Sequence, residues 1–371
     1  MIIHRILRKL GIIQMISARR LQKRIDSERK REEYYVTSNY SADKTEPLTK
    51  SEKQQIDNLW GQLLPVTSYK EFEMFKKVYG FDARFLTHHI YLPIVARLLN
   101  DYHYTTMFDD KGLLGYIASS CIKTPYCYVR HIGYDYYNND MHQLSYKEAI
   151  QICAEQDELF IKPSHETSGG KGAKLLKMDG WTTEQKQKII KEELSGRDKD
   201  YVVQECIHQH PIMGQFNPSS INTFRITTLM LNGKFSLGSI ILRCGKADSS
   251  VDNWGAGGIL ITVSTDGRIN RVGHDISLNE YTHNGDCVFA DCTIQQMPEI
   301  LSLVEKAHRE SFSICKFIGW DIAINEKGEP IIIELNSSQP GVIGEQLVAG
   351  PIFGNRTQEV IDYCKSKKFS Y

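Results

Sequence analysis

The sequence has neither a net charge nor a long apolar segment. Its 45 Lys and Arg residues are balanced by 45 Asp and Glu residues, so binding to nucleic acid through bulk positive charge is not expected. No uninterrupted apolar run approaches the ~20 residues that a membrane-spanning helix needs, and the start of the chain shows no signal-peptide cleavage pattern. We therefore expect a cytoplasmic protein with no nucleic-acid partner.

Paired cysteine motifs are also missing. The nine cysteines form no C-x-x-C pair, which argues against a zinc knuckle and against a disulfide framework. Their neighbours are not basic enough to favour a reactive thiolate. With 371 residues, 41% of them hydrophobic, the chain is long enough to form two or three subdomains around a cleft.

The first 31 residues, by contrast, are locally very basic. Their lysines and arginines are opposed only by Asp26 and Glu28, and isoleucines, leucines and Met15 are interleaved with them. An amphipathic helix at the inner face of a membrane fits this pattern, as does an ordinary helix packed on its own domain. Peripheral membrane contact through residues 1–31 is therefore one of two interpretations of this basic stretch.

The pattern of apolar, polar and turn-forming residues changes along the chain. A polar, turn-rich segment at about 35–51 follows the basic stretch, so we expect a helical extension and linker at 1–45 and a helical region at 46–108. Beyond residue 109, short β-rich runs alternate with turns and helical stretches. This is α+β organisation, with helices expected at 146–155, 183–195 and 298–316 and strands at 159–163, 201–207, 224–231, 235–243, 258–264, 318–324 and 330–336.

A glycine-rich loop follows one predicted strand. The strand ends at Lys162-Pro163, and the chain continues into Ser168-Gly169-Gly170-Lys171-Gly172. Adjacent glycines let backbone N–H groups approach phosphate oxygens, and the serine and lysine add a donor and a charge. Neither the Walker pattern nor the three-glycine dinucleotide pattern is complete here, so a phosphate loop and a plain surface hairpin both stay open.

Two acids and an amide lie in apolar strands near the C-terminus. Residues 318–336 predict a β-hairpin, and a turn centred on Lys327-Gly328 sets Asp321 opposite Glu334. Strand alternation then puts Asn336 on the face of Glu334. Burying these oxygens without partners is costly, and a hard cation such as Mg²⁺ that bridges phosphates would remove the cost. The alternative is that arginines or solvent bind the carboxylates.

Two further strands each carry an arginine on either side of Asn232-Gly233, a strong hairpin-turn signal. Arg225 and Arg243 are embedded in apolar runs, where a guanidinium needs a phosphate or carboxylate partner. A two-residue turn pairs Asn222 with Arg243 and sends Arg225 to the other face. A three-residue loop brings the two arginines together, and the sequence does not decide between these registers.

Taken in order, these motifs resemble the ATP-grasp superfamily. The segments HQHPIMGQFNPSSINTFRITTL, LRCG, VDNWGAGG and IGWDIAI resemble its sugar-transfer-associated family, over roughly residues 75–355. The resemblance implies an ATP-grasp fold in which ATP is held between two α+β subdomains, expected at 109–206 and 207–371.

The same resemblance implies a role for individual residues. Lys111 and Lys162 are expected on the phosphates, with Lys123 as the alternative to Lys111, while the 168–172 loop closes over them. Arg243 is expected to bind phosphate. The adenine is expected at Gln204, Glu205, Cys206 and Ile207, and Mg²⁺ at Asp321, Glu334 and Asn336.

The activity expected from this resemblance is Mg-ATP-dependent carboxylate–amine ligation. The carboxylate attacks the γ-phosphorus to give an acyl phosphate, which an amine converts to an amide. Arg225, Arg243 and the glycines of 255–258 are candidates to stabilise the oxyanion. Asn222 and His210 are expected on the acceptor side, where His210 would take the amine proton or would simply be a packed histidine.

The family's association suggests a sugar acid or other glycan carboxylate and a small amine as substrates, in surface polysaccharide biosynthesis. Two other functions stay open. One is an ATP-grasp phosphotransferase that acts on a hydroxyl group, and the other is a non-catalytic nucleotide-binding adaptor that docks through its basic helix. Lys162 and the expected metal ligands argue against a pure adaptor, because binding alone does not require a full metal set.

Overall fold

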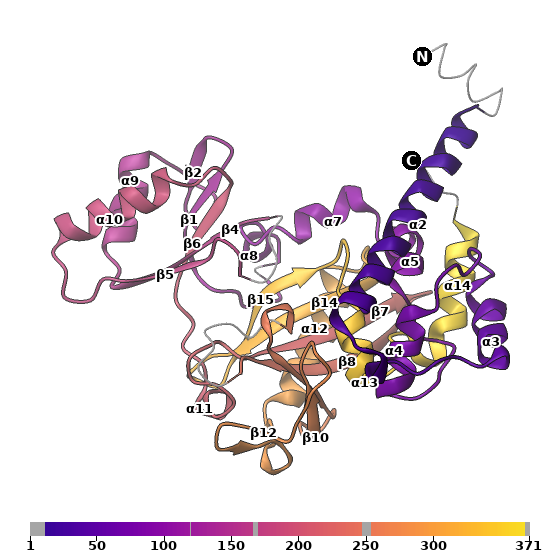
Figure 1. Ribbon diagram of the computed structural model, residues 1–371. Coiled ribbons are helices and arrows are strands. Elements are labelled where there is room, and N and C mark those ends of the chain that lie inside the picture. The colour runs from indigo at the N-terminus through magenta and orange to yellow at the C-terminus, as the bar shows by residue number, and fades with distance from the viewer. Residues whose placement is uncertain (1–11, 119, 166–169, 247–253, 368–371) are drawn as a thin grey trace. The chain divides into compact units, whose positions relative to one another are not determined.

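The computed structural model describes residues 12–118, 120–165, 170–246 and 254–367 (Figure 1). The chain forms two compact units, one of residues 1–101 with 339–371 and one of residues 102–338. The presence of helices and of antiparallel sheets confirms the predicted α+β class. The predicted domains did not group residues 339–371 with the N-terminal helices. The boundaries of those domains stay a prediction.

The first unit is helical. It contains α2 (Ile12–Asn39), η1 (Ala42–Lys44), α3 (Lys50–Trp60), α4 (Lys70–Val78), α5 (His88–Ile90), the π-helical turn η2 (Tyr91–Val95), α6 (Ala96–Leu99), α13 (Ile343–Ala349), η5 (Gly354–Arg356) and α14 (Thr357–Ser366).

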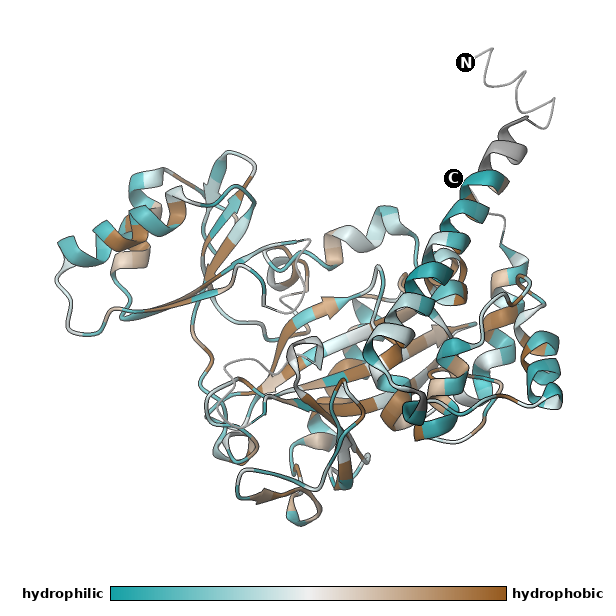
Figure 2. Ribbon diagram, viewed as in Figure 1, coloured by the Kyte–Doolittle hydropathy of each residue, from teal (hydrophilic) through white to brown (hydrophobic). Residues whose placement is uncertain are grey.

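Helix α2 is long and hydrophilic, as Figure 2 shows, and it packs through one face. Ile25, Glu32 and Val36 are buried at helical spacing, and the Glu32 carboxylate lies 2.5 Å from His89 Nδ1. The helix continues to Asn39, so the predicted linker begins later than about residue 35. Residues 1–11 of the basic stretch lie outside the described part, in which no helix is long and apolar enough to cross a membrane.

The second unit begins with α7 (Tyr102–Phe108) and α8 (Leu114–Ile117) and contains a six-stranded antiparallel sheet in the order β3-β2-β1-β6-β4-β5. Two helices pack on one face of this sheet, and capping boxes at Ser145 and Thr182 begin them. The elements are β1 (Cys127–Ile132), β2 (Asp135–Tyr137), β3 (Gln143–Leu144), α9 (Tyr146–Ala154), β4 (Glu158–Pro163), β5 (Lys174–Lys177), α10 (Thr183–Ser195) and β6 (Tyr201–Gln204).

A seven-stranded antiparallel sheet in the order β11-β10-β9-β8-β7-β14-β15 follows. Its elements are α11 (Pro211–Gly214), β7 (Thr223–Leu231), β8 (Lys234–Cys244), η3 (Trp254–Ala256), β9 (Ile259–Val263), β10 (Ile269–His274), β11 (Glu280–Tyr281), η4 (Phe289–Asp291), α12 (Met297–Glu310), β14 (Phe317–Ile324) and β15 (Pro330–Asn336), with β12 (His283–Asn284) and β13 (Cys287–Val288) as a separate pair.

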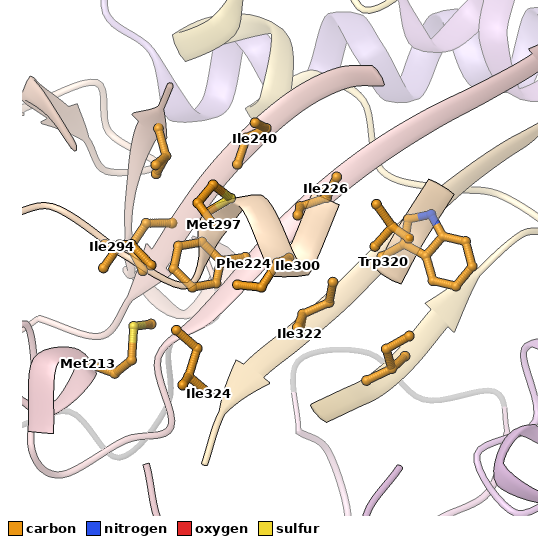
Figure 3. Packing of buried hydrophobic residues seen from close by; sticks show 14 of the residues in the cluster. Met213, Phe224, Ile226, Ile240, Ile294, Met297, Ile300, Trp320, Ile322 and Ile324 are labelled. Atoms are coloured by element: carbon orange, nitrogen blue, oxygen red, sulfur yellow. The ribbon is translucent and has the colours of Figure 1, made fainter. Parts of the chain in front are cut away.

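One face of the seven-stranded sheet forms the main hydrophobic core. Figure 3 shows Met297 and Ile300 of α12 against Phe224, Ile226 and other side chains of the central strands. On β14, residues 318, 320, 322 and 324 belong to this core. Because side chains alternate along a strand, Gly319, Asp321 and Ala323 face the other way. The packing of alternate residues in the core thus determines which side chains lie on the polar face of this sheet.

All seven predicted strands are present. β6 ends at Gln204 rather than at residue 207, and α12 ends at Glu310, short of the predicted 316. The short strands β1, β2, β3, β5 and β10–β13 were not predicted, because runs of two to six residues with mixed burial give little periodicity.

Candidate functional site

Charged side chains form a row across the polar face of the seven-stranded sheet. Arg225 of β7 lies directly opposite Asp321 of β14 in the strand register, and Asp321 lies directly opposite Glu334 of β15. The central strands β7 and β14 pair without a register shift. Opposed residues share a face of the sheet, so one cation and two carboxylates stand side by side.

The predicted pairing of Asp321 with Glu334 is confirmed, although the strand register near the turn differs from the predicted one. Near the turn, Ile324 pairs with Pro330, so the register is centred on Lys327 and is one residue away from the expected one. A bulge then leaves Ile333 as an extra residue of β15 and restores the pairing. A β-bulge therefore sets the position of Glu334.

A second bulge decides between the two registers that the sequence left open for the arginines. Asn232 and Gly233 both have positive φ and form a two-residue turn, yet Arg243 pairs with Thr223 rather than with Asn222. Gly238 and Ser239 of β8 together lie opposite the single residue Thr227. This extra residue brings Arg243 to the face of Arg225, although the turn has two residues.

The Thr227 side chain holds this bulge in place. Its hydroxyl oxygen accepts a hydrogen bond from the Ser239 backbone N–H at 2.8 Å and lies 2.9 Å from the Ser239 hydroxyl. A Cβ at Gly238 would come within 2.4 Å of the same oxygen. Glycine is therefore required at Gly238 by close approach rather than by its backbone conformation.

Asp321 is the centre of the cluster and is only 4% exposed. Arg225 binds both of its oxygens, with Nη2 3.0 Å from Oδ2, and Arg243 Nη2 lies 3.3 Å from Oδ2. Asn336 Nδ2 approaches Oδ2 at 3.5 Å. Burial raises the pKa of Asp321, but the two arginines outweigh it and hold the pKa below its usual value. The carboxylate is thus ionised and contacts both arginines, and its role as a metal ligand stays a prediction.

The two guanidinium groups are held differently. Arg225 grips Asp321 through Nε and Nη2 in a bidentate pair, which fixes its orientation. Arg243 makes one contact to Asp321 and donates from Nε and Nη2 to the Thr223 hydroxyl, at 3.1 and 2.9 Å. Thr223 was not predicted as a site residue, because its position opposite Arg243 depends on the bulge.

Two lysines lie near Glu334. Lys111 Nζ lies 3.0 Å from Glu334 Oε1, and its side chain is 9% exposed. Burial lowers the pKa of Lys162 to about 8; Glu334 opposes this shift, and Lys111 adds to it. Lys123, the alternative to Lys111, pairs with Glu329 at the end of the hairpin and is 63% exposed. The structure therefore brings Lys111 and Lys162, but not Lys123, to the charged row.

The glycine loop after β4 is described from Gly170 onward, so Ser168 and Gly169 lie outside the described residues. Gly170 and Gly172 have φ of 73° and 76°, a conformation that other residues adopt rarely. A Cβ on Gly172 would come within 2.9 Å of the Pro163 ring. Lys171 between them is exposed.

The strand expected at the adenine ends in a buried amide. Gln204 of β6 pairs with Phe160 of β4, and Val202 pairs with Lys162, so these four side chains share one face of the six-stranded sheet. Gln204 is 4% exposed, and its Oε1 has no hydrogen-bond partner in the described part of the chain. A buried acceptor in this state suits a ligand that donates.

The next three residues follow β6 as a non-strand segment. Glu205 donates its backbone N–H to the Tyr126 carbonyl and accepts the Tyr126 N–H on its side chain, both at 2.9 Å. Cys206 and Ile207 are partly buried, and burial raises the pKa of the Cys206 thiol to about 12. Their backbone groups, rather than a thiolate, are what this segment offers a ligand.

His210 and Asn222 make contacts outside the charged row. His210 Nδ1 accepts the Ile212 N–H at 3.2 Å at the start of α11. Asn222 is fully buried, and its Nδ2 lies within 3.0 Å of Gln209 Oε1 and of the carbonyl oxygens of Met213 in α11 and of Asn217 beyond it. The glycine-rich turn predicted at 251–258 is described only from Trp254, because 251–253 lie outside the described residues.

The donor set at Asp321, Glu334 and Asn336 fits a hard cation in its chemistry, since two carboxylates and an amide supply only oxygen ligands. Among the described residues, no group of three or more His, Cys, Asp or Glu could hold a metal ion by itself. Mg²⁺ is commonly held by one or two carboxylates together with phosphates. The residues therefore fit Mg²⁺ only when phosphates complete its coordination.

Comparison with known proteins gives a family match. Residues 95–362 match the model of the family described as sugar-transfer associated ATP-grasp. The search of curated proteins found no match.

Similar solved structures are distant from this chain. D-alanyl-alanine synthetase A from Vibrio cholerae is 11% identical, with 70% of this chain and 63% of that chain covered and a TM-score of 0.38. An L-amino acid ligase from Bacillus licheniformis is 13% identical, with 68% of this chain and 47% of that chain covered and a TM-score of 0.38. D-cycloserine synthetase is 9% identical, with 71% of this chain and 72% of that chain covered and a TM-score of 0.43. The chain thus spans less than two thirds of the first two structures, and likeness at these scores adds nothing to the family match.

Proposed function

Because the chain belongs to the sugar-transfer-associated ATP-grasp family, we propose that it is a ligase that activates a carboxylate with Mg-ATP and joins it to an amine. ATP and Mg²⁺ are the cofactors of ATP-grasp enzymes and follow from this membership. The observation that carries the proposal is the row Arg225–Asp321–Glu334 with Lys111 and Lys162 beside it. It combines oxygen ligands for a cation with positive charges for phosphates.

The proposed metal ligands are Asp321, Glu334 and Asn336. Mg²⁺ bound there would neutralise phosphate charge. Glu334 is the more accessible acid, since its side chain is 25% exposed and that of Asp321 is 6% exposed. Asn336 directs its Nδ2 toward Asp321 and Gly319, which leaves the amide oxygen for the cation.

Three cationic side chains are proposed to hold the phosphates. Lys111 pairs with Glu334, Arg243 contacts Asp321, and Lys162 lies within electrostatic reach of both carboxylates. Of the two arginines, Arg243 is proposed for the phosphate, and Arg225 binds both oxygens of Asp321. Arg225 then keeps the Asp321 carboxylate oriented, and Arg243 also meets the oxyanion that forms when the amine attacks.

The adenine is proposed to lie against the face of the six-stranded sheet that carries Phe160 and Gln204. The unpaired Oε1 of Gln204 would accept a hydrogen bond from an exocyclic amino group, and backbone groups of 205–207 would meet the base edge. Glycines 170 and 172 with Lys171 would contact the phosphates from the loop after β4, together with Ser168 and Gly169.

His210 is not assigned the role of base in this proposal. Its Nδ1 already accepts the Ile212 N–H, so in the neutral ring Nε2 carries the proton and no lone pair is left for the amine. Asn222 is proposed to shape the acceptor side by holding α11 and the residues that follow it, rather than by touching the substrate.

We propose a sugar acid or other glycan carboxylate and a small amine as substrates, in surface polysaccharide biosynthesis in the cytoplasm. Contact of residues 1–31 with the inner face of the membrane would bring the enzyme to such material. Arg19, Arg20 and Lys23 of α2 are exposed, which supports electrostatic contact with anionic lipids.

The test is to incubate the purified protein with Mg-ATP, a panel of uronic acids and a panel of amines. ADP, AMP and phosphate are followed together with product mass. Glu334→Gln should abolish turnover, whereas Glu329→Gln is the matched control at the exposed end of the same hairpin and should not. ADP with an amide product supports the ligase, a stable phosphorylated product indicates a phosphotransferase, and tight ATP binding without turnover across the panels indicates an adaptor.

A further inference from the structure

A single carboxylate outside the charged row ties together the segments that carry Lys111 and Asn336. Asp109 Oδ1 accepts the Ser337 backbone N–H at 2.6 Å and the Ser337 hydroxyl at 2.7 Å, and Oδ2 accepts the Ser338 N–H at 2.9 Å. Ser337 follows Asn336 directly and is fully buried. The end of β15 is therefore bound to the segment that leads into Lys111.

The next two residues extend these contacts to the six-stranded sheet. Asp110 Oδ1 accepts the Gly112 N–H at 2.7 Å, and Lys111 N–H donates to the Ser164 carbonyl at 2.9 Å. A Cβ on Gly112 would come within 3.0 Å of Val202. Ser164 lies two residues after Lys162, so residues 109–112, which include Lys111, contact both the segment that carries Lys162 and the strand end that carries the proposed metal ligands.

Asp109 is also placed against the usual electrostatic preference. It directly follows the last residue of α7, where the partial negative charge of a helix end disfavours a carboxylate, and another acid, Asp110, comes next. Stability alone would favour an amide or a basic residue at this position. Three donors offset the cost, and these donors belong to the residues that follow Asn336.

We propose that Asp109 is a positioning residue of the nucleotide site, which sets Lys111 against Glu334 and orients Asn336 without touching ATP or Mg²⁺. This inference rests on the proposed function. In Asp109→Asn, the amide can keep the two bonds at Oδ1, but its NH₂ group then faces the Ser338 N–H, donor against donor. The strand end and the lysine segment would separate.

The experiment measures the dissociation constant of Mg-ATP by calorimetry, together with the unfolding free energy. Asp275→Asn is the matched control, since Asp275 is also buried and accepts two backbone N–H groups, from Ser277 and Asn279, in a different loop. We expect Asp109→Asn to weaken Mg-ATP binding about 10- to 100-fold, as loss of outer contacts to ligating residues commonly does. It should be destabilised no more than the control, whose affinity should stay unchanged.

The outcomes separate this inference from the proposed function. Wild-type protein that fails to bind Mg-ATP overturns both. Wild-type binding with equal affinity in Asp109→Asn, or equal loss in the Asp275→Asn control, overturns the role of Asp109 alone. If Asp109→Asn does not fold, Ser337→Ala removes one donor of the three and should show a smaller loss of affinity; unchanged affinity in that variant overturns the proposal.

Discussion

A series of linked hydrogen bonds between fully buried side chains of the main core should make the stability of the protein depend on pH. Trp320 donates its indole N–H to the Thr228 hydroxyl oxygen at 2.8 Å, and this hydroxyl lies 2.7 Å from His308 Nδ1. His308 Nε2 lies 2.9 Å from the Cys315 carbonyl. The arrangement is satisfied when His308 is neutral with its proton on Nε2, because Nδ1 then accepts from Thr228.

Burial lowers the pKa of His308 from 6.5 to about 4, and the hydrogen bond to the Cys315 carbonyl opposes this only in part. In the unfolded chain the same group takes up a proton near its ordinary pKa. The stabilising contribution is therefore fully present above pH 6.5 and is lost as the pH falls from there toward 4. It amounts to about 3 kcal/mol in total, of which about 2 kcal/mol is lost between pH 7.5 and pH 5.

The assay is chemical unfolding of the wild type and of His308→Gln at pH 7.5 and pH 5, read by tryptophan fluorescence. All other titrating groups are common to the two proteins, so their contributions cancel in the difference. The wild type should exceed the variant at pH 7.5, and this advantage should shrink by about 2 kcal/mol at pH 5. A difference that stays constant within about 0.5 kcal/mol would refute the buried neutral histidine.

Two substitutions test the charged row. Gly238→Ala should lower the unfolding free energy by about 1–3 kcal/mol, because its Cβ would lie 2.4 Å from a hydroxyl oxygen of the facing strand, and it should weaken Mg-ATP binding by displacing Arg243. Gly196→Ala is the control, with its nearest contact at 3.5 Å, and equal losses would contradict the bulge. Asp321→Asn should destabilise by about 3–5 kcal/mol, because Arg225 and Arg243 lose their shared counter-charge. A loss below about 1 kcal/mol would show that solvent already screens the pair.

The two hairpins show most clearly which parts of the site could be predicted from the sequence. Apolar alternation predicted that Asp321, Glu334 and Asn336 share a face, and the structure agrees because the register at the row is held by the core on the other side. The prediction assumed a regular ladder. It reached the right pair because the shorter register at the turn and the extra residue Ile333 compensate each other.

Bulges are what the sequence could not show. The turn at Asn232-Gly233 was recognised, but the position of Arg243 depends on Gly238 and on the Thr227 hydroxyl opposite it. A glycine inside a predicted strand was the available signal, since such glycines often mark a bulge. Asp109 had no comparable signal, because its partners lie 228 and 229 positions later in the chain and no local pattern links them.

The extra residue in β8 also limits how this hairpin can change in length. Removing Gly238 would leave a regular ladder on the same two-residue turn, with Arg243 still opposite Thr223 and on the side of Asp321. Adding one residue between Lys234 and Arg243 would instead turn the arginine toward the apolar core, unless a second irregularity absorbed it. Deletions at this point should thus be tolerated where insertions are not, so length variants of β8 should be shorter than this chain rather than longer.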